Sequence, residues 1–187
     1  ALKPHSGQLR AAKSMYTFLP PSTEAPRQLP GESSFTDKPV QLSYRLQAPY
    51  SVRCAPHVIG PVLDAIDTVD RWLTVEMNSS NDNPLFVPDD DEVYFSGHFY
   101  GGYVVLGADT LRNAAATLAE LADKQCLLLL DPRRSGLPAN LVADTLRAAG
   151  HHGLKALGIS VSALAAEIAS MAGPVAPHTR PTESMNQ

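Results

Sequence analysis

Four stretches of the chain place apolar or small residues at the spacing of an α-helix, and no stretch of useful length alternates as a strand does. The predicted helices span residues 1–19, 58–78, 100–130 and 154–171. A short hairpin is expected between residues 85 and 95, around the acidic tip 89–92. The pattern therefore predicts a mainly α fold, a bundle of long helices.

A proline-rich segment, residues 20–57, interrupts this helical pattern. It holds many of the chain's 16 prolines and has no sustained period of either kind. Near its end, Tyr50 and Arg53 stand between two prolines in the text QAPYSVRCAP. Because proline lacks an amide donor and favours extended geometry in the residue before it, we expect an irregular loop here. A loop of this length inside a compact domain often carries function.

We treat residues 1–187 as one helical unit, with a first helix at 1–19, an active-site loop region at 20–57 and long helices with connectors at 58–187. The last two predicted helices carry more apolar surface than so short a chain covers, which favours partner helices from other subunits or from further sequence. A bundle that covers its own surface is the alternative. The chain starts without methionine and stops in a polar segment, so we expect a piece of a longer polypeptide.

Charge and cysteine content narrow the classes of partner. The net charge of −4 gives no electrostatic footprint for nucleic acid or an anionic membrane. Two cysteines make no disulfide framework, and no Cys/His grouping indicates a metal site. No apolar run is long enough to span a membrane, and no signal peptide is evident. We expect a cytoplasmic protein that binds small molecules or other protein chains.

Tyr50 and Arg53 are the first candidates for chemistry. A guanidinium can donate two parallel hydrogen bonds to a carboxylate, and a phenol can donate or accept a proton while it stacks on an apolar ligand. Most loop arginines are solvated or make structural pairs, which is the alternative for Arg53.

Three further stretches accompany the Tyr50 segment, and together they resemble one enzyme family. The motifs are KPHSGQLRAA, QAPYSVRCAPHVIG, EMNSSNDNPLF and SGHFYGG. They resemble, in the same order, the motifs of the aromatic amino acid ammonia-lyase and aminomutase family, which includes histidine, phenylalanine and tyrosine ammonia-lyases. The resemblance extends over essentially the whole chain, and four ordered motifs are far more specific than one.

The resemblance implies an activity and roles for four residues. These enzymes eliminate ammonia without oxidation from an aromatic L-amino acid, using a methylidene-imidazolone electrophile formed autocatalytically from an internal Ala-Ser-Gly. Arg53 would bind the substrate carboxylate, and Tyr50 would lie close to the electrophile and the amino group. Gln47 would complete the polar wall of the site. Phe99 would contact the electrophile or the substrate ring.

The resemblance also implies an assembly. No Ala-Ser-Gly occurs in the 187 residues, and the family's base tyrosine lies on an N-terminal loop outside them, so this segment alone is expected to be inactive. Members of the family are homotetramers whose active sites combine loops from three subunits, and whose long helices form a shared core. That expectation agrees with the excess apolar surface noted above.

Three positions depart from the family pattern, and the end of the chain bears on the substrate. Ala48 replaces the usual aspartate, His98 an asparagine and Tyr100 a histidine. The terminal ESMNQ resembles the segment of tyrosine and phenylalanine enzymes rather than that of histidine enzymes. We therefore expect Asn186 and Gln187 near a phenylalanine or tyrosine substrate.

Two other functions remain open from the sequence. An aromatic amino acid 2,3-aminomutase shares these motifs and returns the amine to the β-carbon. A non-catalytic helical oligomerisation module could keep the scaffold and lose the chemistry, as the departures at Ala48 and His98 allow.

Overall fold

The computed structural model describes residues 2–19 and 47–178, and these are mainly helical, as predicted. The helices are α1 (Ser6–Thr17), α2 (Tyr50–Arg53), α3 (Ala55–Met77), α4 (Gly102–Leu130), α5 (Pro132–Ser135), α6 (Asp144–Ala148) and α7 (Lys155–Ser170). Two 3-10 turns, η2 (Ala139–Leu141) and η3 (Ala176–His178), and an antiparallel hairpin of β1 (Leu85–Val87) and β2 (Glu92–Tyr94) accompany them.

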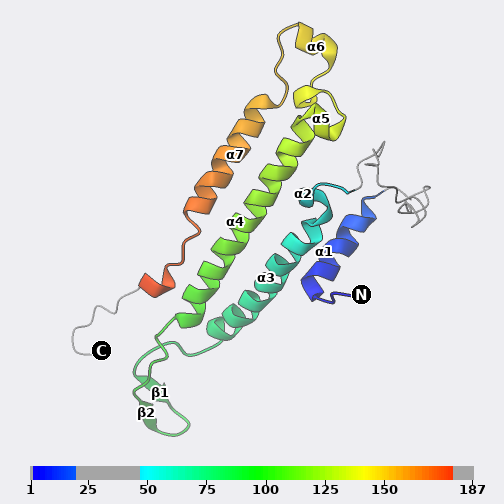
Figure 1. The fold of residues 1–187 in the computed structure, drawn as a ribbon. Helices are drawn as coiled ribbons and strands as arrows, with labels where there is room; N and C mark the ends of the chain where they lie inside the picture. The colour runs from blue at the N-terminus through cyan, green and yellow to red at the C-terminus, as the bar shows by residue number, and fades with distance from the viewer. Residues whose placement is uncertain (1, 20–46, 179–187) are drawn as a thin grey trace, which may run out of the picture.

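The four longer helices lie side by side in a layer, in the order α1, α3, α4, α7 (Figure 1). α1 packs on α3, α3 on α4, and α4 on α7. The hairpin joins α3 to α4 at one end of this layer, and α5, η2 and α6 join α4 to α7 at the other end (Figure 1). Within the described residues, no further helix covers the two faces of this layer.

Two glycines let α1 approach the backbone of α3. A Cβ on Gly7 would lie 2.1 Å from the carbonyl oxygen of Gly60, and a Cβ on Gly60 would lie 2.6 Å from the Cα of Gln8. The amide of Gly7 donates to Oδ1 of Asp64 over 2.7 Å, so a side chain of α3 satisfies one open N–H at the start of α1. The KPHSGQ motif thus builds a close helix crossing.

The core is thin, and much apolar surface stays open. The buried apolar residues of the two central helices, α3 and α4, are small or medium in size: Ala55, Val62, Val69, Ala114 and Leu121. Within the described ranges, no large side chain is fully buried. Exposed leucines and isoleucines follow α4 and α7: Leu106, Leu111, Leu118, Leu127, Leu129, Leu157, Ile159 and Leu164. The excess apolar surface predicted from the sequence is present, and the described chain does not form a bundle that covers it.

The segment between the two prolines is helical, so the irregular loop predicted there is wrong. Tyr50–Arg53 forms α2, and α3 already begins at Ala55, inside the expected loop region 20–57. Pro49 is the N-cap of α2, and Pro56 lies in the first turn of α3. The first turn of a helix has no intrahelical partner for its N–H groups, so proline is tolerated there.

Most of the other predicted elements start and end within about three residues of the expected positions. α1 is shorter than the stretch 1–19, while α4 and α7 match their predicted ranges closely. The hairpin pairs Leu85 with Tyr94 and Val87 with Glu92, as the acidic tip between them indicated. Among the described residues, none of the helices has the length and apolar character needed to cross a membrane.

Candidate functional site

The short helix α2 presents Tyr50 and Arg53 on neighbouring positions of one helical turn. The amides of Val52 and Arg53 each donate to the carbonyl oxygen of Pro49 over 3.0 Å, and the amide of Cys54 donates to that of Tyr50 over 2.8 Å. These bonds close the turn before α3 begins. A three-residue separation places both side chains on the same face.

Arg53 lies over the ring of Tyr50, with its guanidinium carbon 4.6 Å from the ring centroid. This distance is that of a cation–π contact, which orients the guanidinium without using its hydrogen-bond donors. Tyr50 is 73% exposed, and Arg53 is exposed as well. No ion pair joins Arg53 to a carboxylate within residues 2–19 and 47–178. The pair therefore has free donors for an anionic ligand.

Helix α4 holds α2 in place, and an open pocket lies between them. Nε2 of Gln125 donates to the carbonyl oxygen of Ser51 over 2.8 Å. The pocket, of about 500 Å³, is lined by Tyr50 together with Lys124 and Arg134. Gln125 was not a candidate from the sequence, although an amide directly before the apolar run 126–130 is a polar group that needs partners once it is covered.

A second group of predicted motifs meets at the opposite end of α4. The Asn-rich motif after α3 folds back on itself, with Nδ2 of Asn81 donating to the carbonyl oxygen of Glu76 over 2.7 Å. Oδ1 of Asn83 accepts the amide of Ser96 over 2.8 Å. Nδ1 of His98 lies 3.3 Å from the carbonyl oxygen of Ser80. The motifs EMNSSNDNPLF and SGHFYGG thus form one loop cluster, and His98 helps to hold it.

Phe99 projects from this loop cluster and is 63% exposed. It precedes the start of α4, whereas Gln125 contacts α2 some 23 residues further along that helix. At 1.5 Å per residue, roughly 35 Å of helix separates the two ends. The structure brings Tyr50 and Arg53 together but does not bring Phe99 to them within one chain.

The remaining candidates have no described contact with this pair. Gln47 and Ala48 are exposed residues just before α2, and Tyr100 is exposed beside Phe99. Asn186 and Gln187 lie outside the described residues. Their predicted roles stay predictions.

Two buried aspartates on α4 were missed by the sequence reasoning. The pKa of Asp109 is lowered chiefly by the backbone N–H groups of Ala176 and Val175, which its carboxylate accepts. The pKa of Asp123 is lowered chiefly by the hydroxyl of Ser162, 2.5 Å from its Oδ1, and further by Lys124. The signal was present, because a carboxylate in a helix that is apolar almost all round must find donors.

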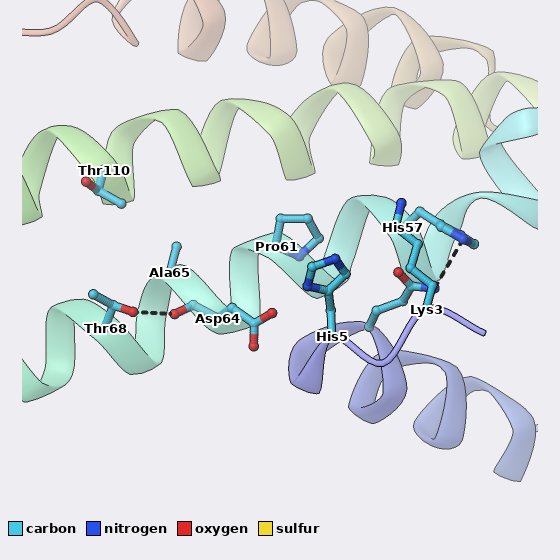
Figure 2. A pocket seen from close by; sticks show the side chains of 9 residues that line it. Lys3, His5, His57, Pro61, Asp64, Ala65, Thr68 and Thr110 are labelled. Carbon is cyan, nitrogen blue, oxygen red and sulfur yellow. Dashed lines mark hydrogen bonds between the residues drawn. The ribbon is translucent and has the colours of Figure 1, made fainter. Parts of the chain in front are cut away.

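Another pocket, of about 470 Å³, lies where α1 crosses α3 (Figure 2). Lys3, His5 and His57 line it, and Nε2 of Gln8 lies 3.1 Å from Nε2 of His57. The described residues include no group of three or more His, Cys, Asp or Glu that could hold a metal ion. We assign this pocket to the helix crossing.

Comparison with known proteins agrees with the arrangement of these motifs. The family model described as aromatic amino acid lyase matches residues 1–187. The chain belongs to this family. Its four motifs are therefore those of an aromatic amino acid lyase, and the resemblance inferred from the sequence is confirmed.

Two curated relatives of this lyase-family chain differ in the substrate that they are named for. The histidine ammonia-lyase of Symbiobacterium thermophilum is 37% identical over 187 residues, which are 100% of this chain and 34% of that protein. The phenylalanine ammonia-lyase of Nostoc punctiforme is 38% identical over 159 residues, which are 84% of this chain and 27% of that protein. The chain thus spans about a third, or less, of these relatives.

A solved structure with the same helical arrangement is the phenylalanine aminomutase of Pantoea agglomerans. It superposes with a TM-score of 0.82 and is 31% identical, over 97% of this chain and 36% of that protein. The fold of this lyase-family chain is therefore that of a segment of a larger helical enzyme.

Proposed function

We propose that this chain is the helical segment of an ammonia-lyase that eliminates ammonia from an aromatic L-amino acid to give an arylacrylate. The observation that supports this most is the pair on α2, in which an exposed Arg53 stacks on an exposed Tyr50 at 4.6 Å. The guanidinium has no carboxylate partner in the described chain, so its paired donors suit the carboxylate of an amino acid.

In this reaction the β C–H bond and the C–N bond break, a carbon–carbon double bond forms, and the amine leaves as ammonia. Arg53 binds the substrate carboxylate and sets the direction of the amino acid. The phenol of Tyr50 lies beside that anchor, where it can exchange a proton with the amino group. Removal of the β-proton falls to a base outside these 187 residues.

The family's methylidene-imidazolone would supply an electrophile, and it would form from an Ala-Ser-Gly outside this chain. Residues on α2 suit such a neighbour. Tyr50 is largely exposed and borders an open pocket of about 500 Å³, which leaves room for a flat ring beside the phenol. No residue of this chain is proposed to bind a metal.

We further propose that the enzyme is a homotetramer with active sites shared between subunits. Phe99 and the Arg53–Tyr50 pair lie roughly 35 Å apart along α4, so one site can contain both only if they come from different chains. The exposed apolar residues of α4 and α7 offer the surface that such an assembly would cover.

Phenylalanine or tyrosine is the favoured substrate over histidine. The support is the terminal ESMNQ, where Asn186 and Gln187 stand in place of the acidic segment of histidine enzymes. An amide offers both donors and acceptors, which suits a phenol or a neutral ring, whereas a carboxylate suits an imidazole and its proton.

A 2,3-aminomutase is the second candidate, because the Pantoea agglomerans phenylalanine aminomutase superposes on 97% of this chain. Both reactions use the same carboxylate anchor. They differ in whether the amine returns to the β-carbon before it leaves the site.

Product analysis tests the proposal. The longer polypeptide that carries this chain is incubated with L-phenylalanine, L-tyrosine and L-histidine, and free ammonia, arylacrylates and β-amino acids are measured. We expect ammonia with cinnamate or coumarate, formed faster than urocanate. A β-amino acid as the main product would favour the mutase, urocanate as the fastest product would overturn the substrate assignment, and no product from any of the three would favour the non-catalytic module.

A further inference from the structure

Gln125 on α4 holds the short helix α2 through one hydrogen bond. Its Nε2 donates to the carbonyl oxygen of Ser51 over 2.8 Å, and both residues are half-buried. Within residues 2–19 and 47–178, this is the one hydrogen bond that joins α2 to another helix. In the described chain, α2 thus has one directional attachment to the layer besides its covalent link to α3.

A helix as short as α2 needs such an attachment. Its four residues are far fewer than the roughly 12 at which an isolated helix becomes marginally stable in water. Its backbone bonds close one turn, in which the amides of Val52 and Arg53 both donate to Pro49. The last carbonyl groups of a helix lack an intrahelical partner, and the side chain of Gln125 supplies a donor to one of them. We therefore expect the place of α2 along α4 to depend on this contact.

The contact with Gln125 lies beside the proposed substrate anchor. Ser51, whose carbonyl accepts the hydrogen bond, directly follows Tyr50 and precedes Arg53 by two residues on the same turn. Residues of α4 on both sides of position 125 border the pocket that Tyr50 lines, and Leu128 is one of them. A displacement of α2 from α4 would therefore move Tyr50 and Arg53 together and change the shape of this pocket.

We propose that Gln125 is a positioning residue for the lyase reaction, because it fixes the turn that carries Arg53 and Tyr50. This inference rests on the function proposed above. Gln125 does not line the pocket beside Tyr50, so it acts through α2 and not by contact with the substrate. A misplacement of about 1 Å in a binding group can cost about 100-fold in catalysis. One hydrogen bond outside the site can therefore control substrate binding.

Ser162 on α7 gives a matched control. Its hydroxyl donates to Oδ1 of Asp123 over 2.5 Å, and Asp123 stands two residues before Gln125 on α4. Two residues along a helix point about 200° apart, so these contacts lie at the same height of α4 but on opposite sides. Ser162→Ala therefore removes a hydrogen bond between α4 and α7 without a change at α2.

The test compares Gln125→Leu, Gln125→Arg and Ser162→Ala in the full-length enzyme. Leucine keeps the bulk and removes the donor, whereas Nε of arginine lies as many bonds from Cα as Nε2 of glutamine and can still donate. We expect Gln125→Leu and Ser162→Ala to lower the melting temperature. Only Gln125→Leu should raise KM for L-phenylalanine and weaken equilibrium binding of cinnamate, each by about tenfold, and Gln125→Arg should restore most of both.

A double variant tests whether Gln125 acts through Arg53. In an Arg53→Ala background the carboxylate anchor is already lost, so Gln125→Leu should weaken cinnamate binding by less than about twofold. Two independent contributions would add instead, and the full tenfold loss would remain. A residue that only supports the packing of α4 would show that additive behaviour.

The outcomes separate this role from the proposed function. If the wild type is active and Gln125→Leu leaves KM and cinnamate binding unchanged, or changes them no more than Ser162→Ala does, the positioning role is overturned and the lyase function stands. Additive losses with Arg53→Ala overturn it as well. If Gln125→Leu does not fold, Gln125→Glu, which keeps the shape and loses the donor, must show the tenfold changes or the role is overturned. A wild type that forms no product from any of the three amino acids overturns the function and this inference with it.

Discussion

The two ends of α4 carry the predicted site residues in different ways. At one end, Tyr50 and Arg53 stand on a helical turn that backbone hydrogen bonds close and that Gln125 fixes to α4. At the other, Phe99 stands on a loop cluster held by side chains that bond to backbone groups, such as Asn81 and Asn83. The charged end has regular structure, and the aromatic end has a folded loop.

This difference agrees with the roles proposed for the two ends. A guanidinium that forms two bonds to a carboxylate needs a fixed direction, and a helical turn with a stacked ring provides it. An aromatic ring that packs against another ring needs burial among apolar groups but no fixed hydrogen-bond direction, so a loop can present it. Substitutions at the Arg53 end should therefore cost more activity than substitutions at the Phe99 end.

Arg53→Ala should have the largest effect. If Arg53 binds the substrate carboxylate as proposed, the variant loses two charge-assisted hydrogen bonds, and we expect kcat/KM to fall roughly 1000-fold, with a higher KM and a lower turnover. Steady-state formation of cinnamate or coumarate by the full-length enzyme measures this. Arg147→Ala is the control, because Arg147 is an exposed arginine that pairs with Asp144 on α6, remote from α2.

Mixing subunits that carry different substitutions tests whether the two ends of α4 serve one site from different chains. Phe99→Ala should cost about tenfold, as expected for an apolar contact. If the two ends serve one site from different chains, subunits with Arg53→Ala mixed with subunits with Phe99→Ala should regain activity above either parent. Activity no higher than the average of the two parents would contradict shared sites.

Tyr50→Phe should have an effect between those of Arg53→Ala and Phe99→Ala, with kcat lower by roughly 100-fold and KM little changed. The variant removes the phenol hydroxyl but keeps the ring under Arg53, so the anchor for the carboxylate remains. Tyr50→Ala, which also removes the stacking partner, should raise KM in addition. Equal KM values in the two variants would show that the stack does not orient Arg53.

Acid should have the smallest effect, a loss of stability without a change in site chemistry. The pKa values of Asp109 and Asp123 are lowered in the folded chain, so their contribution is complete above the unfolded pKa of about 4 and is lost as the pH falls through the folded values. We expect the melting temperature to fall below about pH 4. Asp123→Asn should melt lower at neutral pH and show a smaller acid dependence. An unchanged acid dependence would exclude Asp123 as a source.

The sequence predicted the helices well and the connections between them less well. The stretch that forms α4 shows its helix directly, because its apolar residues recur over nearly thirty positions. Pro49 and Pro56 led to the wrong prediction of an irregular loop. A proline at the start of a helix has the same local sequence pattern as one that ends a helix. The two cases differ only in where the helix starts, and α2 is held by a hydrogen bond from Gln125, which is far away in the sequence.

The site was predicted as a set of residues but not as a geometry. Tyr50 and Arg53 are three residues apart, so their proximity follows from local structure. The separation of Phe99 from them depends on the length and direction of α4, which no motif encodes. The partners of Asp109 and Asp123 lie 66 and 39 residues away in the sequence, beyond any local pattern.

The layer of helices has one more consequence, for how the protein must be handled. A layer one helix thick has little interior of its own, so we expect its stability to depend on what packs against its two faces. If copies of the same subunit supply that packing, mass action links unfolding to dissociation. Dilution would then unfold the protein at a temperature where a concentrated sample stays intact.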